Sequence, residues 1–201
     1  MGTTERRQRE AEQRRRSILE AARRLFWRQG YAGATMPGIA AEAELAPGTL
    51  YLYFQGKDAL YVELLIEGYE LLLERLKEQA GVDAPPAEQG GRLVEAFIQF
   101  ARDYPEYFGI IFFLIQRETS GFEGNFPPDQ IARIRDREQA CKDVAARVLE
   151  RIDLPPARRA RIVDAVWGML AGVVFYFRND EPFEQIAAEA KGLILKALFG
   201  P

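Results

Sequence analysis

The residues of this chain best suited to holding a charged partner lie in one run, TMPGIAAEAELAPGTLYLYFQGK, from Thr35 to Lys57. Tyr51 and Tyr53 carry hydroxyls beyond apolar rings, and Thr49 offers a hydroxyl at shorter range. Lys57 adds a positive charge at the expected start of a helix, where the helix amides also face an anion. Groups of this kind contact phosphate oxygens. The run therefore favours binding of a polyanion.

Catalytic chemistry finds little support in the sequence. Histidine is absent, which removes the commonest general base and the commonest metal ligand. We find no P-loop and no dinucleotide fingerprint. The single cysteine, Cys141, excludes a disulfide within one chain and is typical of a reducing cytoplasm. We expect no enzymatic activity, no cofactor and no metal site, although a site built from carboxylates alone stays possible.

Apolar spacing predicts that two short helices and a tight turn position these groups. Thr35 stands where a helix N-cap is expected, and Pro47 suits the first turn of the second helix. Leu50 and Phe54, four residues apart, belong to the inner face of that helix. Its outer face then carries Gly48, Thr49, Tyr51, Leu52 and Tyr53. This arrangement is a helix-turn-helix, whose second helix enters a DNA major groove.

Two segments of this region resemble the DNA-binding motif of the tetracycline-repressor (TetR) family of bacterial regulators. They are GTLYLYFQGKDAL, Gly48 to Leu60, and ILEAARRLFWRQGYAGATM, Ile18 to Met36. The resemblance covers about the first 60 residues. It implies a double-stranded DNA operator, a homodimer and a small-molecule effector. The matching family positions that touch DNA are Thr35, Pro47, Gly48, Thr49, Tyr51, Leu52, Tyr53 and Lys57.

The motif departs from the family pattern at four positions. Glu44 stands where the turn usually has a glycine, because one turn residue tends to need a positive φ. Ala46 replaces the usual Ser or Thr cap of the second helix. Pro37 and Leu52 replace residues that often read base edges, and leucine offers only an apolar contact such as one with a thymine methyl. We therefore expect DNA shape and backbone contacts to carry much of the specificity.

Charge is distributed unevenly along the 201 residues, whose net charge is −3. Residues 1–60 hold ten Arg or Lys and seven Asp or Glu, whereas residues 61–201 hold seventeen and twenty-three. Residues 1–28 alone carry nine Arg against four Glu. A basic end on an acidic body orients a molecule toward a polyanion. A solvated N-terminal helix would have the same composition, but beside a helix-turn-helix the arginines favour DNA.

Helical periodicity recurs along the rest of the chain, and strand signals are nearly absent. We predict an all-α fold of about nine helices, with a three-helix head over 1–56 and a ligand-sensing, dimerising bundle over 57–201. The expected helices cover about 8–29, 57–79, 91–103, 105–118, 129–152 and 156–178, besides the two of the motif and one from Pro182. Loops are expected over 83–91 and 120–129. The apolar, uncharged run from Ala165 to Phe177 is shorter than the roughly 20 residues that span a membrane. It therefore predicts a buried helix.

The bundle is unusually rich in aromatic residues. Most of them suit an ordinary core, but helical bundles also form ligand pockets between their helices, and the family resemblance favours a pocket here. Residues 105–118 are apolar on every face of their helix, so they must be buried or line a cavity. The residues expected at a pocket for a partly apolar molecule are Phe97, Phe100, Tyr104, Tyr107, Phe108, Ile111, Phe112, Trp167 and Tyr176.

The last two predicted helices suit a dimer interface. Gly168 and Gly172 lie four residues apart in an apolar helix, which permits close approach of another helix. A two-fold pairing of these helices would form a four-helix interface. The residues expected there are Gly168, Gly172, Ile186, Leu193 and Ile194.

These features predict a ligand-responsive transcriptional regulator, specifically a cytoplasmic, dimeric repressor released from a palindromic operator. Two alternatives stay open. The first is an all-helical enzyme acting on a hydrophobic small molecule, which the absence of histidine and of metal motifs disfavours. The second is a constitutive architectural DNA-binding protein, which needs no large aromatic body.

Overall fold

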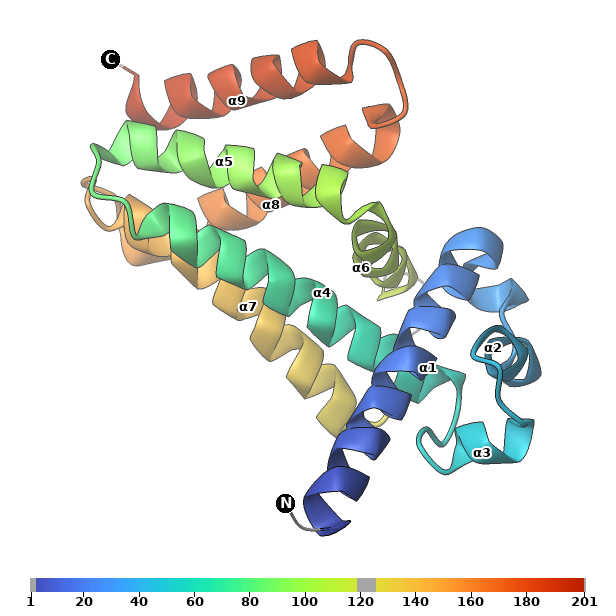
Figure 1. Cartoon of the computed structure of the whole chain (residues 1–201). Helices are drawn as coiled ribbons and strands as arrows, with labels where there is room; N and C mark the ends of the chain where they lie inside the picture. Colours follow the sequence, from blue (N-terminus) through green and yellow to red (C-terminus); the bar gives the residue numbers. More distant parts are fainter. Residues whose placement is uncertain (1–2, 119–125, 201) are drawn as a thin grey trace.

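The computed structural model describes residues 3–118 and 126–200, with side chains over 5–111 and 126–200. Within those ranges the chain is all-α, with nine helices and no strand, so the predicted fold class is confirmed (Figure 1). The helices are α1 (Thr3–Gly33), α2 (Met36–Glu42), α3 (Pro47–Tyr51), α4 (Lys57–Ala80), α5 (Pro86–Asp103), α6 (Pro105–Glu118), α7 (Pro128–Leu149), α8 (Pro156–Phe177) and α9 (Phe183–Phe199).

Proline marks most of the helix starts. Its fixed φ suits the first turn, where the missing N–H has no partner in any case. The helices that begin in this way are α3, α5, α6, α7 and α8. The short helix α2 has Pro37 in its first turn and also a side-chain cap, since the Thr35 hydroxyl accepts a hydrogen bond from the Gly38 amide at 3.2 Å. The N-cap predicted at Thr35 is therefore confirmed.

Three helices differ from their predicted boundaries. Helix α5 begins at Pro86 rather than near residue 91, because Gly90 and Gly91 lie inside the helix, where α9 packs against them. Helix α1 runs from Thr3 to Gly33 rather than over about 8–29, although Gly30 breaks its helical geometry with φ 68°. Helix α7 ends at Leu149, three residues before the predicted end. Most of the loop predicted over 120–129 lies outside the described residues.

The N-terminal helices and the bundle share one continuous apolar core. Helix α1 crosses the start of α4, with α2 and α3 on its far side and α6 lying between α1 and the bundle (Figure 1). Tyr61 of α4 contacts both Phe26 and Tyr31 of α1, with ring centroids 5.3 Å and 4.9 Å apart. Ile18, Leu50 and Tyr61 are all buried in the same cluster as the interior of the bundle. The division at residue 56 therefore stays a prediction.

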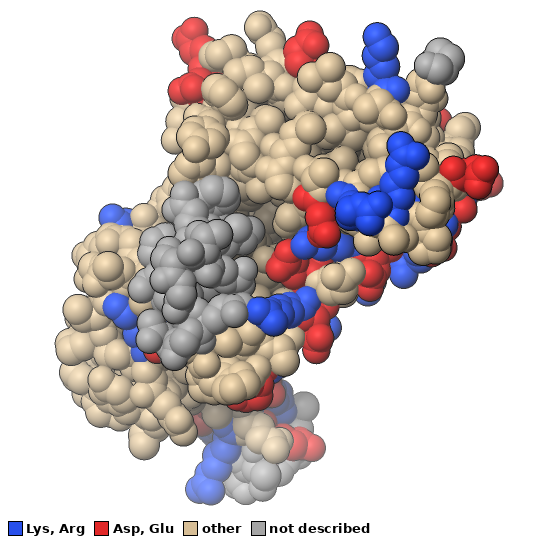
Figure 2. Space-filling model, turned by 180° about the vertical axis from the view of Figure 1, so that it is seen from behind, with Lys and Arg blue, Asp and Glu red and all other residues tan. Residues whose placement is uncertain are grey.

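Helix α8 exposes much of its apolar surface. By length and composition this helix could cross a membrane, yet only 22% of its most apolar stretch is buried. The prediction that Ala165 to Phe177 forms a buried helix is therefore wrong for a single chain. Figure 2 shows a largely uncharged surface over α8 and α9, with charged side chains gathered below it. Its exposed large side chains are Met169, Phe175, Tyr176, Phe177 and Leu193.

Candidate nucleic-acid interface and ligand cavity

The turn between α2 and α3 has the backbone geometry that the sequence predicts. Glu44 adopts φ 56°, and it is the one non-glycine residue with a positive φ in the described part of the chain. The Leu45 amide donates to the Ala40 carbonyl at 2.8 Å, which closes the turn. A left-handed glutamate costs roughly 1–2 kcal/mol. The backbone is therefore strained at Glu44, in the turn that sets the angle between α2 and α3.

Helix α3 and the turn after it have a buried side and an exposed side, as predicted, but the helix ends at Tyr51, so Leu52, Tyr53 and Phe54 follow it. Leu50 and Phe54 are 0% and 3% exposed, whereas Tyr51 and Leu52 are 51% and 83% exposed. A Cβ added to Gly48 would meet nothing within 4 Å. The exposed face of α3 therefore presents an aromatic hydroxyl and an apolar side chain beside a bare backbone position.

The other predicted contact residues of this motif surround α3. Thr35 and Pro47 are exposed at the starts of α2 and α3, and Thr49 and Tyr53 are half-buried. Ala46, at the N-cap of α3, makes no side-chain cap hydrogen bond. The structure thus brings these residues together at one end of the molecule, next to the exposed face of α3. Their contacts with DNA stay a prediction.

Lys57 has a second role that the sequence did not predict. Its ammonium donates to the carbonyl oxygens of Tyr31 and Ala34 at 2.7 Å and 3.1 Å. It also lies 4.3 Å from the centroid of the Tyr31 ring, a cation–π distance. Lys57 therefore ties the start of α4 to the chain that follows the break at Gly30. A phosphate contact by the same ammonium would add to these bonds.

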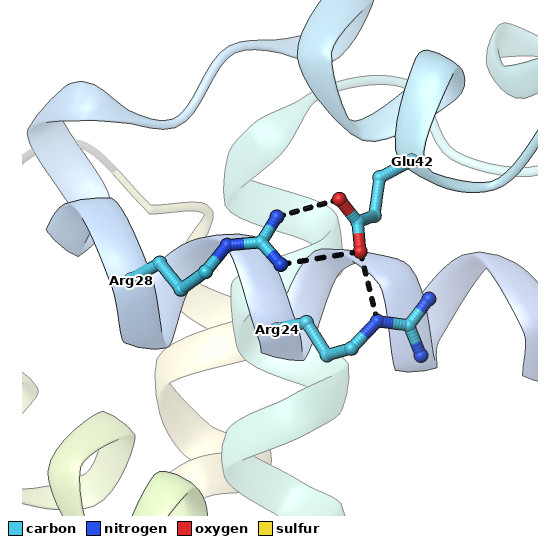
Figure 3. A network of polar contacts seen from close by, with 3 residues as sticks. All are labelled: Arg24, Arg28 and Glu42. Carbon is cyan, nitrogen blue, oxygen red and sulfur yellow. Dashed lines mark hydrogen bonds and ion pairs between the residues drawn. The ribbon is translucent and has the colours of Figure 1, made fainter.

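A second polar network fixes α2 against α1 (Figure 3). Glu42 of α2 accepts from Arg28 through both carboxylate oxygens, at 2.5 Å and 3.4 Å, and from Arg24 at 2.9 Å. The hydrogen bond from Arg28, followed by that from Arg24, holds the pKa of Glu42 below its usual value. Glu42 therefore uses two basic residues of α1 to orient α2, and these two arginines are already paired within the protein.

The first half of α1 carries all but one of the remaining basic residues of this helix, the exception being Arg23. Arg6, Arg7, Arg9, Arg14 and Arg16 are exposed, and Arg6 pairs with Glu10 in the same helix at 2.8 Å. Glu63 of α4 pairs with both Arg15 of α1 and Arg133 of α7, each at 3.1 Å. The exposed arginines project along α1, while Arg15 joins the helix to the bundle.

An apolar cavity of about 80 Å³ lies between α4, α5, α7, α8 and α9. Of the predicted ligand residues, Phe97 and Trp167 line it. Cys141 also lines it, and burial raises the pKa of its thiol to about 12, so it serves as a small apolar wall. The lining residues that the sequence analysis missed include Leu93, Val94, Val148, Val163, Leu170, Leu198 and Phe199. Their helical periodicity indicated burial, but it could not distinguish a packed core from a cavity wall.

Most of the other predicted ligand residues pack as core. Phe100, Phe108 and Ile111 surround, with Phe97 and Trp167, a space of only about 10 Å³, which is about the minimum for one water molecule. Tyr107 is buried, and Tyr104 is half-buried against it. Tyr176 is 72% exposed, whereas an internal pocket would require a buried side chain. The Phe112 side chain lies outside the described residues.

The predicted dimer residues divide into two groups. A Cβ added to Gly168 or Gly172 would meet nothing within 4 Å, and Leu193 is 64% exposed. Ile186 is half-buried. Ile194, in contrast, is 4% exposed and lines the cavity, so it packs within a single chain and its place at an interface stays a prediction. Adjacent residues of a helix point about 100° apart, which turns Ile194 inward where Leu193 points outward.

Helix α6 joins the bundle to α1. A Cβ added to Gly109 would lie 3.0 Å from the Trp27 ring, so α1 packs on bare backbone of α6. Arg178, at the end of α8, lies 5.1 Å from the Trp27 ring centroid and 6.0 Å from that of Phe108. Burial lowers the pKa of Arg178. Tyr61 of α4 donates to the Ile110 carbonyl of α6 at 2.5 Å.

Comparisons with known proteins agree with this geometry. Residues 18–64 match the family model described as bacterial regulatory proteins, tetR family. That range contains α2 and α3 and reaches into α4.

Two curated relatives align with the chain over different lengths. The HTH-type transcriptional activator FasR of Mycolicibacterium smegmatis is 25% identical over 183 residues, which cover 88% of this chain and 78% of FasR. The HTH-type transcriptional regulator UidR of Escherichia coli is 38% identical over 71 residues. That match covers 35% of this chain and 36% of UidR, so it spans little more than a third of the relative.

A solved structure resembles nearly the full length of the chain. The structure of AibR in complex with isovaleryl coenzyme A and operator DNA aligns with a TM-score of 0.72 at 24% identity. The alignment covers 94% of this chain and 99% of AibR. The likeness shows that the helical body, as well as the N-terminal motif, has a known fold.

Proposed function

Because this chain belongs to the tetR family of bacterial regulatory proteins, we propose that it is a ligand-responsive transcriptional repressor. In this proposal it binds a palindromic DNA operator as a homodimer, and a partly apolar small molecule releases it. The protein acts in the cytoplasm and is not an enzyme. Residues 1–56 provide the DNA-binding unit, and residues 57–201 sense the ligand and form the dimer.

The observation that carries the proposal is the exposed face of α3 on a rigidly held motif. Tyr51 and Leu52 project from α3 while Leu50 and Phe54 anchor it from below. Glu42 and Lys57 tie the helices on either side of α3 to α1 and to the chain that follows it. A recognition helix must keep its orientation when it enters the major groove, and these contacts support that requirement.

The exposed apolar face of α8 and α9 supports a homodimer. Gly168 and Gly172 leave room for another helix, and Met169, Tyr176 and Leu193 would lose contact with water in the interface. Burial of apolar surface is the main driving force of such association. Two-fold pairing at this face presents two copies of α3 to the half-sites of a palindrome.

The cavity and its neighbours provide a route from ligand to DNA. Phe97 lies on the cavity wall, and its ring is 5.2 Å from that of Trp167 and 6.2 Å from that of Phe108 on α6. From Phe108 the contacts continue through Arg178 to Trp27 of α1. A ligand can release DNA only if the protein has two conformations that place the DNA-binding helices differently, and if the ligand binds one of them better than the other. A cavity between five helices is suited to that difference, because small helix movements change its volume.

The similarity to AibR, whose structure contains isovaleryl coenzyme A, suggests the kind of ligand. An acyl thioester combines a short apolar group with a polar remainder. The cavity of about 80 Å³ suits an apolar group of a few carbons rather than a whole drug-sized molecule, which occupies roughly 300–1,000 Å³. We therefore place only the apolar part of the effector inside the bundle.

The test uses DNA fragments from the region around the protein's own gene. We expect binding of a palindromic fragment, with an affinity that falls steeply as salt increases, and release by a short-chain acyl thioester. In a reporter assay, deletion of the gene should raise transcription from the bound promoter. Lower transcription after deletion would instead identify an activator. Operator binding that no small molecule alters would favour a constitutive DNA-binding protein.

A further inference from the structure

The apolar cavity and a polar groove of the bundle share one wall. The groove lies between α4, α5 and α9 and has a volume of about 770 Å³. Leu195 of α9 lines both the cavity and the groove. On α5, Gly90 lines the cavity and the adjacent Gly91 lines the groove. The two spaces are therefore separated by little more than the contact between α9 and this glycine pair.

The contact between α9 and the glycine pair is close and consists of side chains on bare backbone. A Cβ added to Gly90 would lie 3.0 Å from the Phe199 ring, and one added to Gly91 would lie 3.3 Å from Leu195. The partition on the α9 side thus consists of the Leu195 and Phe199 side chains. Side chains change rotamer on a far shorter timescale than helices move. The partition can therefore open without unfolding either helix.

The two spaces differ in chemistry. The side chains that line the cavity are apolar apart from the Trp167 indole N–H and the Cys141 thiol, so it offers few hydrogen-bond partners to a polar group. The groove is lined by three cationic and three anionic side chains, Arg75, Arg92, Lys191, Glu78, Glu88 and Glu95. Two ion pairs lie along it, Lys191 with Glu95 at 3.0 Å and Arg92 with Glu88 at 2.8 Å. Exposed pairs of this kind are weak, so a ligand can replace one partner.

We infer that the effector enters between α5 and α9 at Gly90 and Gly91, with a short apolar group in the cavity and a large charged head group in the groove. This inference rests on the proposed ligand-responsive function and adds the path and the second half of the site. The groove is several times larger than the cavity, so we assign the larger part of the ligand to the groove and the smaller part to the cavity. Lys191 is the groove residue that would bind an anionic group of the head, because it sits beside Leu195 at the partition.

The test uses three probes with the full-length protein: butyryl coenzyme A, coenzyme A, and the butyryl thioester of N-acetylcysteamine, which lacks the charged head. Titration calorimetry measures binding. We expect butyryl coenzyme A to bind most tightly. Coenzyme A should bind roughly fiftyfold more weakly than butyryl coenzyme A, because it lacks the contribution of about three buried methylenes. The truncated thioester should also bind more weakly, because the groove stays empty.

Matched variants locate the head group. Lys191→Gln should weaken butyryl coenzyme A binding by about tenfold, the range for a hydrogen bond to a charged group, and should leave the truncated thioester unaffected. Lys196→Gln is the control, because Lys196 is exposed on the same helix but does not line the groove. Leu195→Ala should speed association of butyryl coenzyme A in stopped-flow measurements, because it thins the partition.

Each negative outcome has a distinct meaning. Equal binding by Lys191→Gln and Lys196→Gln, or equal binding of the truncated and complete thioesters, would overturn the placement of the head in the groove. No binding of butyryl coenzyme A at millimolar concentration would overturn the inference as well. Binding with the expected variant pattern but without any change in operator affinity would support the site and contradict the proposed regulatory function.

Discussion

Arg28 and Glu42 join α1 to α2 through two parallel hydrogen bonds, the shorter one 2.5 Å long. Arg24 adds a third bond to the same carboxylate. The geometry is the bidentate form that makes arginine–carboxylate pairs specific in direction. Since the turn after α2 orients α3, this pair helps to fix the direction of α3 relative to α1.

The first prediction concerns that pair. Glu42→Gln keeps the shape of the side chain but removes its charge, so α2 should become less firmly oriented and operator affinity should fall. The slope of affinity against salt should stay the same, because no phosphate contact is lost. Fluorescence anisotropy with a labelled operator measures both. Glu88→Gln, which breaks the Arg92 pair on α5, is the control and should leave operator affinity unchanged.

The second prediction separates the two roles of Lys57. Lys57→Ala removes the bonds to Tyr31 and Ala34, so the melting temperature should fall. If Lys57 also contacts a phosphate, the salt slope of operator binding should decrease by about 0.9. A lower melting temperature with an unchanged slope would restrict Lys57 to its structural role. Tyr53→Phe, which removes one hydroxyl, is the companion variant for a contact without charge.

The third prediction concerns base recognition by Leu52. This side chain is 83% exposed, so Leu52→Ala should leave the melting temperature unchanged. If it packs on a thymine methyl in the major groove, replacing that thymine by uracil should cost wild type about 0.8 kcal/mol, roughly fourfold in affinity. The variant should be insensitive to the same replacement. Equal sensitivity of wild type and variant at every thymine would exclude this contact.

The fourth prediction concerns the dimer. Gly172→Leu adds a bulky side chain where a single chain has open space, so the fold of each chain should be unaffected. In the proposed interface the same side chain would block close helix approach, and sedimentation should detect monomers. Operator affinity should then fall, because a monomer meets only one half-site. Ala132→Leu on the exposed side of α7 is the control. An unchanged dimer in the Gly172 variant would place the interface elsewhere.

The fifth prediction concerns the contact between α6 and α1. Gly109→Ala should stabilise α6 as a helix but would push the Trp27 ring, which lies 3.0 Å from the added Cβ. Because Trp27 is 44% exposed, the ring can move, and we expect α1 to shift with it and operator affinity to change. The smaller ring of Trp27→Phe should restore affinity when combined with Gly109→Ala. Wild-type operator binding by the single Gly109 variant would argue against α6 as part of the route from the cavity to α1.

The sequence predicted what depends on local spacing. Leu50 of α3 and Phe54, just after α3, are both buried, as their spacing of four residues indicated, and Thr35 caps α2 because its hydroxyl reaches the Gly38 amide. Even the positive φ of Glu44 followed from its position in the turn. These features involve neighbours within a few residues, which a single sequence displays directly.

What the sequence could not predict depends on contacts between distant segments. Lys57 turns toward Tyr31, which is 26 residues away, and no periodicity reports such a pairing. Ile194 and Leu193 both continue an apolar pattern, yet only the packing of α9 against α5 and α8 decides which one faces the cavity. The same holds for Phe100 and Phe108, since a packed core and a pocket wall require the same residue types.

The shared core of the N-terminal helices and the bundle has a consequence for unfolding. Without Tyr61 of α4, the rings of Phe26 and Tyr31 lose the partner that lies within about 5 Å of both. The DNA-binding helices should therefore melt together with the bundle in one cooperative transition. A molecule bound far from DNA, in the cavity, would then slow hydrogen exchange at Leu50 as much as at Phe97.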